Sequence, residues 1–170
     1  MATAIVYGSN TGVGQTVADD LKELLGDLVD DVHNIAEIEV DKLLEYDKLI
    51  LGVSTWDIGE LQYDWGDKAE VLPEKDWSGK TIAFWGMGDA AGYPDTFVDA
   101  MGMVFAPMLQ KGAKLVGKVP VDGYEFEMSR SLCDNGTNFI GLALDNDNDA
   151  DLTDDRLAKW ADQLKSEMFA

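Results

Sequence analysis

The stretch ATAIVYGSNTGVGQTVADDLKELL, residues 2–25, decides the fold class of the chain. It begins with Ala2–Tyr7, a nearly continuous apolar run of the kind found in strands buried on both faces of a parallel sheet. A glycine-rich segment, residues 8–16, follows this run. Apolar residues then recur at the spacing of an amphipathic helix, at Val13, Val17, Leu21 and Leu24. A strand, a glycine-rich turn and a helix are typical of an α/β protein.

The same alternation continues to the end of the chain. The next strand signals are Val32–Ile35, which is weak, and Lys48–Val53 and Thr81–Trp85, which are strong. Lys114–Val116 begins a fifth strand, and Phe139–Leu144 resembles a second piece of it, after a polar insertion at residues 118–138. The pattern predicts a doubly wound, five-stranded parallel sheet with helices on both faces.

Apolar spacing predicts two further helices. Pro94 suits the first position of a helix, and apolar residues follow it on one side, at Phe97, Met101, Val104, Phe105 and Met108. The last helix has Asp151 or Thr153 as its expected N-cap, with an apolar stripe at Leu157, Trp160, Leu164 and Met168. We expect four tryptophans to pack in the core or on the surface: Trp65, Trp77, Trp85 and Trp160.

The composition fits one folded domain, residues 1–170. With 170 residues, of which 46% are hydrophobic, the chain is long enough to bury a large core. Its single cysteine, Cys133, cannot form an internal disulfide, which is consistent with a reducing cytoplasm. The apolar runs are too short to cross a bilayer, and the first residues do not resemble a secretion signal. We expect a cytoplasmic protein without membrane contact, and a monomer.

The charge is the strongest signal in the composition. The chain has 13 Lys and Arg residues against 33 Asp and Glu residues, a formal net charge of −20. Such a field repels nucleic acid phosphates and anionic lipids, which excludes both as partners, and it attracts basic protein surfaces. Simple solubility and a salt-adapted lineage remain alternative reasons for it.

Ligands of such a sheet bind beyond the carboxyl ends of the strands. Three loops follow such ends, at residues 8–16, 53–64 and 86–96. The first combines glycines with hydroxyl side chains before a helix, which suits an anion, although it contains no Lys or Arg. It matches neither the G-x-G-x-x-G pattern of dinucleotide sites nor the G-K-[ST] pattern of nucleoside triphosphate sites. An ordinary glycine-rich turn remains the alternative.

Ser9-Asn10-Thr11-Gly12 resembles the phosphate loop of the flavodoxins, T-x-T-G-x-T. Further segments resemble this family in the right order: STWDIGEL at 54–61, GMGDAAGY at 86–93, DGYEF at 122–126, GLALD at 141–145 and DLTDDR at 151–156. The resemblance implies a flavodoxin-like strand order, 2-1-3-4-5, with strand five split by the insertion as in the long-chain subgroup. One departure is Gly14, where the family usually has Thr or Ser; Thr16 or a bound water could replace the lost hydroxyl.

The resemblance also implies a non-covalent FMN cofactor. Trp56 and Tyr93 would stack on the two faces of the flavin, and Asp89 would accept the hydrogen of ring atom N3. The first loop would contribute Ser9, Asn10, Thr11, Gly12, Val13 and Gly14. The second would contribute Ser54, Thr55, Trp56, Asp57, Ile58 and Gly59. The remaining contacts would come from Met87, Gly88, Asp89, Tyr93, Thr96 and Asp147.

The residues themselves predict no catalytic chemistry and no metal site. The only histidine, His33, lies in the weak second strand, and Cys133 has no neighbouring base. The acidic run Asp145–Asp151 lacks the pattern of a calcium loop. FMN would therefore supply the redox chemistry, and the carboxylates near it would make the protein a low-potential donor. Relatives often have glycine where this chain has Asp57. The resemblance therefore implies that a neutral semiquinone is stabilised less in this protein than in relatives with glycine at that position.

We therefore expect a one-electron carrier, not an enzyme, that substitutes for ferredoxin between a reductase and protein acceptors. The expected partners are basic redox proteins: a ferredoxin/flavodoxin-NADP reductase, ferredoxin-dependent enzymes and photosystem I. An FMN-dependent oxidoreductase of quinone-reductase type is the alternative, and it would need an open flavin face. A receiver domain shares the strand order, but it needs carboxylates where this chain has Gly8–Asn10 and Ser54–Trp56. That class is excluded.

Overall fold

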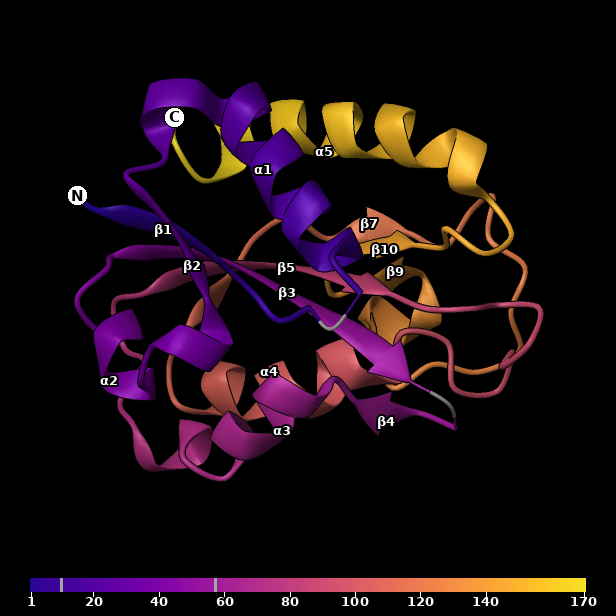
Figure 1. The fold of residues 1–170 in the computed structure, drawn as a ribbon, viewed down its shortest axis with the longest axis horizontal. Helices are drawn as coiled ribbons and strands as arrows, with labels where there is room; N and C mark the ends of the chain where they lie inside the picture. The colour runs from indigo at the N-terminus through magenta and orange to yellow at the C-terminus, as the bar shows by residue number, and fades with distance from the viewer. Residues whose placement is uncertain (10, 57) are drawn as a thin grey trace.

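The expected strands form a parallel sheet at the centre of the molecule (Figure 1). The computed structural model describes residues 1–9, 11–56 and 58–170. The parallel strands of this sheet are β1 (Thr3–Tyr7), β2 (Asp31–Asn34), β3 (Lys48–Trp56), β5 (Thr81–Met87), β6 (Lys114–Leu115) and β10 (Leu142–Leu144), and the short β4 (Glu60–Leu61) pairs antiparallel with the end of β3. Their order is β10-β5-β3-β1-β2, and β6 also pairs with β5. Because β6 and β10 both pair with β5, they are two pieces of one strand position, which confirms the expected order with a split fifth strand.

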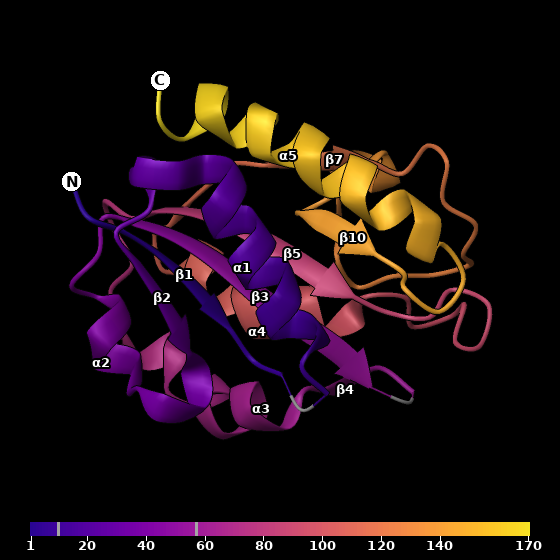
Figure 2. The ribbon, with the colours of Figure 1, turned by 45° about the horizontal axis from the view of Figure 1, so that its top comes forward.

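Helices cover both faces of the sheet (Figures 1 and 2). On one face lie α1 (Val13–Leu25) and α5 (Thr153–Glu167), and on the other lie α2 (Val40–Leu43), α3 (Tyr63–Ala69) and α4 (Asp99–Gln110). Alternate residues of β1 belong to two separate cores: Ile5 packs with α1 and α5, whereas Ala4 and Val6 pack with the other helices. The four tryptophans expected to pack are fully buried: Trp65, Trp77, Trp85 and Trp160. Among the described residues, no helix has both the length and the apolar character needed to span a bilayer.

The insertion forms a small antiparallel sheet of its own. Its strands are β7 (Val119–Pro120), β9 (Asn138–Phe139) and β8 (Leu132–Cys133), in the order β7-β9-β8. The expectation that Phe139 begins the second piece of the main strand is wrong, because Phe139 pairs with this small sheet. Its ring packs against three other aromatic rings, those of Phe97, Tyr124 and Phe126. The main strand resumes only at Leu142.

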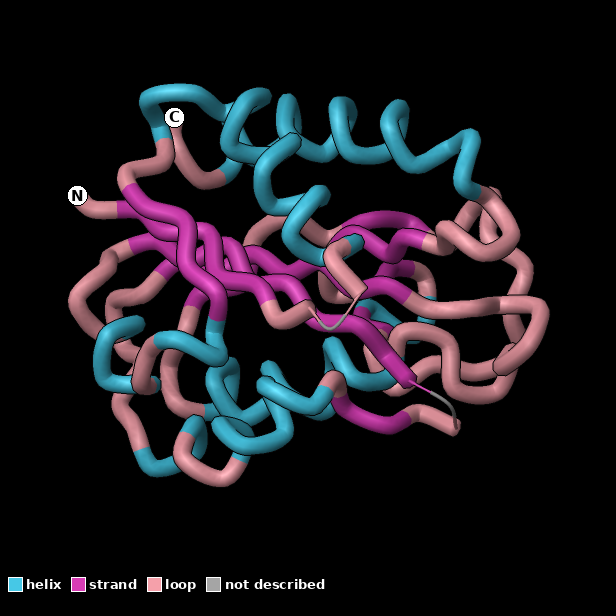
Figure 3. Tube along the Cα trace, viewed as in Figure 1, coloured by secondary structure: helices cyan, strands magenta, loops and turns pink. Residues whose placement is uncertain are grey.

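The starts of two helices also differ from expectation. α4 begins at Asp99, not at Pro94, because Val98 has a left-handed φ of 49°. The carbonyl of Pro94 instead accepts the N–H groups of residues 127 and 128 of the insertion. α5 begins at Thr153, and its N-cap is neither Asp151 nor Thr153 but Leu152, whose apolar side chain cannot accept a hydrogen bond. Asp151 lies in the preceding 3₁₀ turn, and the hydroxyl of Thr153 donates to Asn146. Short 3₁₀ turns complete the helical segments (Figure 3), at Gly26–Leu28, Ile35–Glu37, Leu72–Glu74, Asp134–Gly136 and Ala150–Leu152.

Candidate functional site

The three expected loops meet because the strands before them end side by side. In the sheet register, Tyr7 of β1 lies beside Gly52 of β3, and Ser54 of β3 lies beside Met87 of β5. Met87 in turn lies beside Leu144 of β10. The loops after these four strands therefore open at the same end of the sheet, where ligands of doubly wound folds bind.

A cleft of about 330 Å³ lies at this end, a size typical of small-molecule sites. It is lined by Thr11, Val13, Ser54, Thr55, Trp56, Met87, Gly88, Asp89, Tyr93, Asn146 and Asp147. Every residue of this lining except Asn146 was expected from the sequence to bind the cofactor. Asn146 was missed because an amide side chain in a loop carries no spacing signal.

Two exposed aromatic rings belong to the cleft. The side chains of Trp56 and Tyr93 are 38% and 39% exposed, whereas the other tryptophans are fully buried. Trp56 ends β3, and the preceding residue fixes the loop, because Thr55 Oγ1 accepts the N–H of Ala100 at 3.0 Å. Rings that remain this accessible in a cleft can stack on a flat ligand.

The loop before α1 has the features of an anion site. Gly12 is the N-cap, with φ of 88°, a conformation that favours glycine, and its N–H donates to Ser9 Oγ at 2.9 Å. The first turn of α1, all of which is described, contains no acidic residue, so its free N–H groups and the helix dipole are unopposed.

Gly14 permits a close approach of α1 to β1. A Cβ atom at this position would lie 2.9 Å from the carbonyl oxygen of Gly8, which is closer than a side chain tolerates. Thr16 does not replace the hydroxyl that is missing at Gly14, because its own Oγ1 donates to the carbonyl of Gly12 at 3.1 Å. This loop therefore offers an anion mainly N–H groups and the hydroxyls before Gly12.

Three carboxylates form an acidic corner beside the cleft: oxygens of Asp89 and Asp147, which line it, and of Asp145, which lies behind them, are within 4.8 Å of one another. Asp145 is 1% exposed and accepts four hydrogen bonds. The donors are the N–H groups of Ala90 (2.9 Å), Asp147 (3.2 Å) and Asn148 (3.0 Å), and the side-chain amide of Asn148 (2.8 Å). This amide also donates to Asp89 at 2.8 Å. Asp145 and Asn148 thus join the loop after β5 to the loop after β10.

The cleft is strongly negative. Hydrogen bonds from the N–H of Gly92 and the amide of Asn148 lower the pKa of Asp89. Burial, and then the charges of Asp89 and Asp145, raise the pKa of Asp147. None of the described residues that line the cleft is basic. An additional negative charge placed here would therefore meet uncompensated repulsion.

Six of the expected residues lie outside this lining: Ser9, Gly12, Gly14, Ile58, Gly59 and Thr96. Ile58 is 77% exposed. Thr96 packs beneath the turn at Gly59, and its hydroxyl is buried with no hydrogen-bond partner among the described residues. Asn10 and Asp57, which were also expected to contact the cofactor, fall outside the residues that the structure describes.

The two groups that the sequence left without a role are also absent from the lining. His33 Nε2 lies 2.7 Å from the hydroxyl oxygen of Tyr46, which itself donates to Asp31. Burial raises the pKa of the Cys133 thiol, which makes it less reactive.

Comparison with known proteins places the whole chain among one group of sequences. The family model described as Flavodoxin matches residues 5–160. Flavodoxin from Nostoc sp. is 45% identical over 163 residues, which cover 96% of this chain and 95% of the relative. Flavodoxin 2 from Escherichia coli is 38% identical over 168 residues, which cover 99% of this chain and 97% of the relative.

Solved structures agree with these sequence matches. Fusobacterium nucleatum flavodoxin bound to flavin mononucleotide superposes with a TM-score of 0.90, at 29% identity and with 98% of both chains covered. Oxidised flavodoxin 2 from Bacillus cereus has a TM-score of 0.72 at 24% identity, with 99% of this chain and 100% of the other covered, and it shares the fold.

Proposed function

The chain belongs to the flavodoxin family, and from this membership we propose how its own residues hold FMN. The protein is an electron-transfer flavoprotein that works with redox partners and turns over no substrate of its own. The observation that carries the proposed site is the cleft at the carboxyl ends of β1, β3 and β5. It unites two accessible aromatic rings, a helix N-terminus without acidic residues and an acidic corner.

The phosphate group of FMN fits the N-terminus of α1. When bound, FMN supplies the one-electron chemistry that no side chain of the cleft supplies. The N–H groups of the first turn would donate to the phosphate oxygens, together with the hydroxyls of Ser9 and Thr11. Ser9 Oγ accepts the N–H of Gly12, so its own hydroxyl hydrogen is available to a phosphate. Because the loop has no basic side chain, these donors alone would neutralise the ligand.

The flavin ring fits between the second and third loops. We assign Trp56 and Tyr93 to its two faces, where they would exclude water and contribute stacking and apolar burial. Asp89, ionised because hydrogen bonds lower its pKa, would accept the hydrogen of N3. Asp147 and Asn146, in the loop after β10, line the same cleft and would contact the ribityl chain.

The acidic corner would lower the reduction potential of the site. One charge at about 10 Å, in a medium of effective dielectric constant about 20, costs about 1.7 kcal/mol, or about 70 mV for a one-electron couple. Asp147 is exposed, so solvent screening would reduce the shift in potential that its charge causes to some tens of mV. Asp145 is buried, and its charge is screened less.

We further propose that residues 1–170 are one cytoplasmic domain of the long-chain subgroup, monomeric, with the insertion at 118–138. The exposed apolar side chains of Ile58 and Tyr63, 77% and 71% exposed, lie in or next to the second loop and offer a contact for a redox partner. With a net charge of −20, that partner would be basic. A ferredoxin/flavodoxin-NADP reductase, ferredoxin-dependent enzymes and photosystem I are the proposed partners.

An anaerobic potentiometric titration of the FMN-loaded protein tests this function. We expect two resolved one-electron steps, and the variant Asp147→Asn should raise the second potential by some tens of mV. Asp162→Asn, which removes an exposed charge on α5, is the control and should leave both potentials unchanged. A single two-electron step would instead favour an oxidoreductase of quinone-reductase type, and an unchanged second potential in Asp147→Asn would contradict the electrostatic argument.

A further inference from the structure

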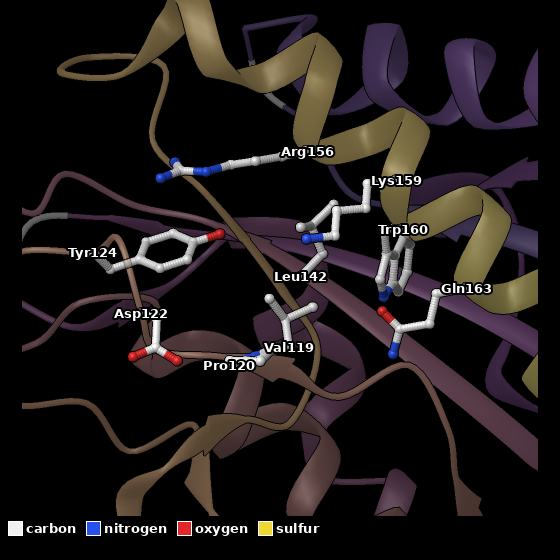
Figure 4. A pocket seen from close by; sticks show the side chains of 9 residues that line it. All are labelled: Val119, Pro120, Asp122, Tyr124, Leu142, Arg156, Lys159, Trp160 and Gln163. Carbon is white, nitrogen blue, oxygen red and sulfur yellow. The ribbon is translucent and has the colours of Figure 1, made fainter.

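A second cavity lies between α5 and the insertion (Figure 4). Its volume is about 360 Å³, and it shares no lining residue with the first cleft. One wall consists of residues that recur on a single face of α5: Arg156, Lys159, Trp160 and Gln163. The insertion supplies the facing wall with Val119, Pro120, Asp122 and Tyr124, and Leu142 of β10 lies between the two. The cavity therefore depends on the insertion as well as on the main sheet.

Much of this cavity is apolar and aromatic. Trp160 Nε1 donates to the carbonyl of Gly117 at 2.9 Å, and the hydroxyl of Tyr124 donates to the carbonyl of Ala143 at 2.6 Å. Because the polar atoms of both rings are already bonded to the main chain, what the rings present to the cavity is their apolar surface. A flat or branched apolar group would find a dry contact here.

Two cations reach over this apolar surface from α5 (Figure 4). The guanidinium of Arg156 lies 4.1 Å from the centre of the Tyr124 ring and donates to the carbonyl of Gly123 at a long 3.4 Å. Its nearest acid, Asp149, is 3.7 Å away, and the nitrogen that faces this acid is buried without a hydrogen-bond partner among the described residues. Arginine has five N–H donors, so most of them are unused.

Lys159, unlike Arg156, has no hydrogen-bond or ion-pair partner among the described residues, although the protein has 33 acidic residues. Asp122 is the only acidic residue among those described in the lining. In a molecule of net charge −20, a cavity lined by two cations, one of them without a protein partner among the described residues, and by one acid is less negative than its surroundings.

We infer that this cavity binds a small organic anion. Its head group, a carboxylate, sulfonate or phosphate, would accept hydrogen bonds from Arg156 and Lys159. Its flat apolar body would lie against Tyr124 and Val119, next to Trp160, which is itself only 1% exposed. Such a ligand would join α5 to the insertion without contact to the FMN cleft, so the inference goes beyond the proposed function.

The experiment compares three ligands of one shape on the FMN-loaded protein: indole-3-acetate, indole-3-acetamide and tryptamine, which are anionic, neutral and cationic. The readout is the side-chain N–H signal of Trp160 in ¹H–¹⁵N spectra, assigned with the variant Trp160→Phe. We expect indole-3-acetate to shift this signal saturably. The amide should bind about tenfold more weakly because it loses charge-assisted hydrogen bonds, and tryptamine should not bind.

Substitution of the exposed lysine provides the matched test. Lys159→Gln should weaken the binding of indole-3-acetate about fivefold or more and leave that of the amide unchanged. Lys165→Gln, on the same helix but paired with Asp162, should leave both unchanged. The inference would be overturned if the three ligands bound equally, if the Trp160 signal did not shift, or if the shift were confined to the signal of Trp56. Equal losses of indole-3-acetate affinity in the two lysine variants would overturn it as well.

Discussion

Replacement of Asp145 by asparagine removes a buried carboxylate that accepts four hydrogen bonds. Each of its two oxygens accepts two N–H donors: Oδ2 those of Ala90 and the Asn148 amide, and Oδ1 those of the main chain at Asp147 and Asn148. An asparagine keeps one oxygen and puts an NH₂ donor in place of the other. Whichever way the amide turns, two donors therefore lose their acceptor and face another donor.

The magnitude follows from this count. A hydrogen bond to a charged group contributes about 1.5–3 kcal/mol, so two lost bonds cost about 3–6 kcal/mol. Relief of the repulsion between Asp145 and its acidic neighbours, Asp89 and Asp147, offsets part of this loss. We expect Asp145→Asn to lower the free energy of unfolding by about 3 kcal/mol. Because the loop at Ala90 loses its anchor, FMN affinity should fall about tenfold.

Urea unfolding of the apoprotein, followed by far-ultraviolet circular dichroism, measures the first quantity, and quenching of FMN fluorescence measures the second. Asp162→Asn, an exposed carboxylate on α5, is the control and should stay within about 0.5 kcal/mol of the wild type. If Asp145→Asn loses no more stability than this control, the four hydrogen bonds do not hold the two loops together and the reasoning is refuted.

Three further predictions concern the cofactor cleft and the insertion. Trp56→Ala should weaken FMN binding by about 1–3 kcal/mol and leave the unfolding of the apoprotein unchanged, since the ring is accessible; a matching loss of stability would contradict this. Gly14→Ser should bind FMN more weakly than the wild type but more tightly than Gly14→Ala. Both variants crowd the carbonyl of Gly8, and only serine adds a hydroxyl that can donate to the phosphate. If FMN titrations give the two variants the same affinity, the hydroxyl has no such role. Tyr124→Phe should cost about 1 kcal/mol at neutral pH. Burial raises the pKa of Tyr124 from 10.0 to about 12. Its contribution to the free energy of unfolding is therefore complete below pH 10 and is lost as the pH rises towards 12. Urea unfolding across this range should show that the stability of the variant declines less with pH than that of the wild type.

The predictable parts of the fold are those in which neighbouring residues of the sequence are buried together and so leave a local apolar pattern. β1, β3 and β5 are covered on both faces, so their residues form continuous apolar runs. α3 was not expected, because Trp65 is the one buried position among its seven residues and a single buried position sets no helical period. It depends on distant contacts: Trp65 is fully buried, and its indole N–H donates to the carbonyl of Gly52 at 2.7 Å. Such contacts leave no local pattern.

The candidate site shows the same division. Motifs of the first three loops indicated most of the residues that line the cleft, because each loop follows a strand that is visible in the sequence. The bond between Asn148 and Asp89 joins residues 59 positions apart, and the amide of Asn148 is not part of any motif. The start of α4 was misplaced for a related reason, since the backbone at Val98 and the use of the Pro94 carbonyl are decided by the insertion.

The insertion has a consequence for self-association. β10 is the last strand in the order of the main sheet, and a strand edge with free N–H and C=O groups can pair with another chain. The insertion lies against this edge: Tyr124 donates to the carbonyl of Ala143, and β7 carries Pro120, which has no N–H to offer. A chain from which this segment has been deleted would expose the edge, and we would expect it to aggregate through intermolecular strand pairing.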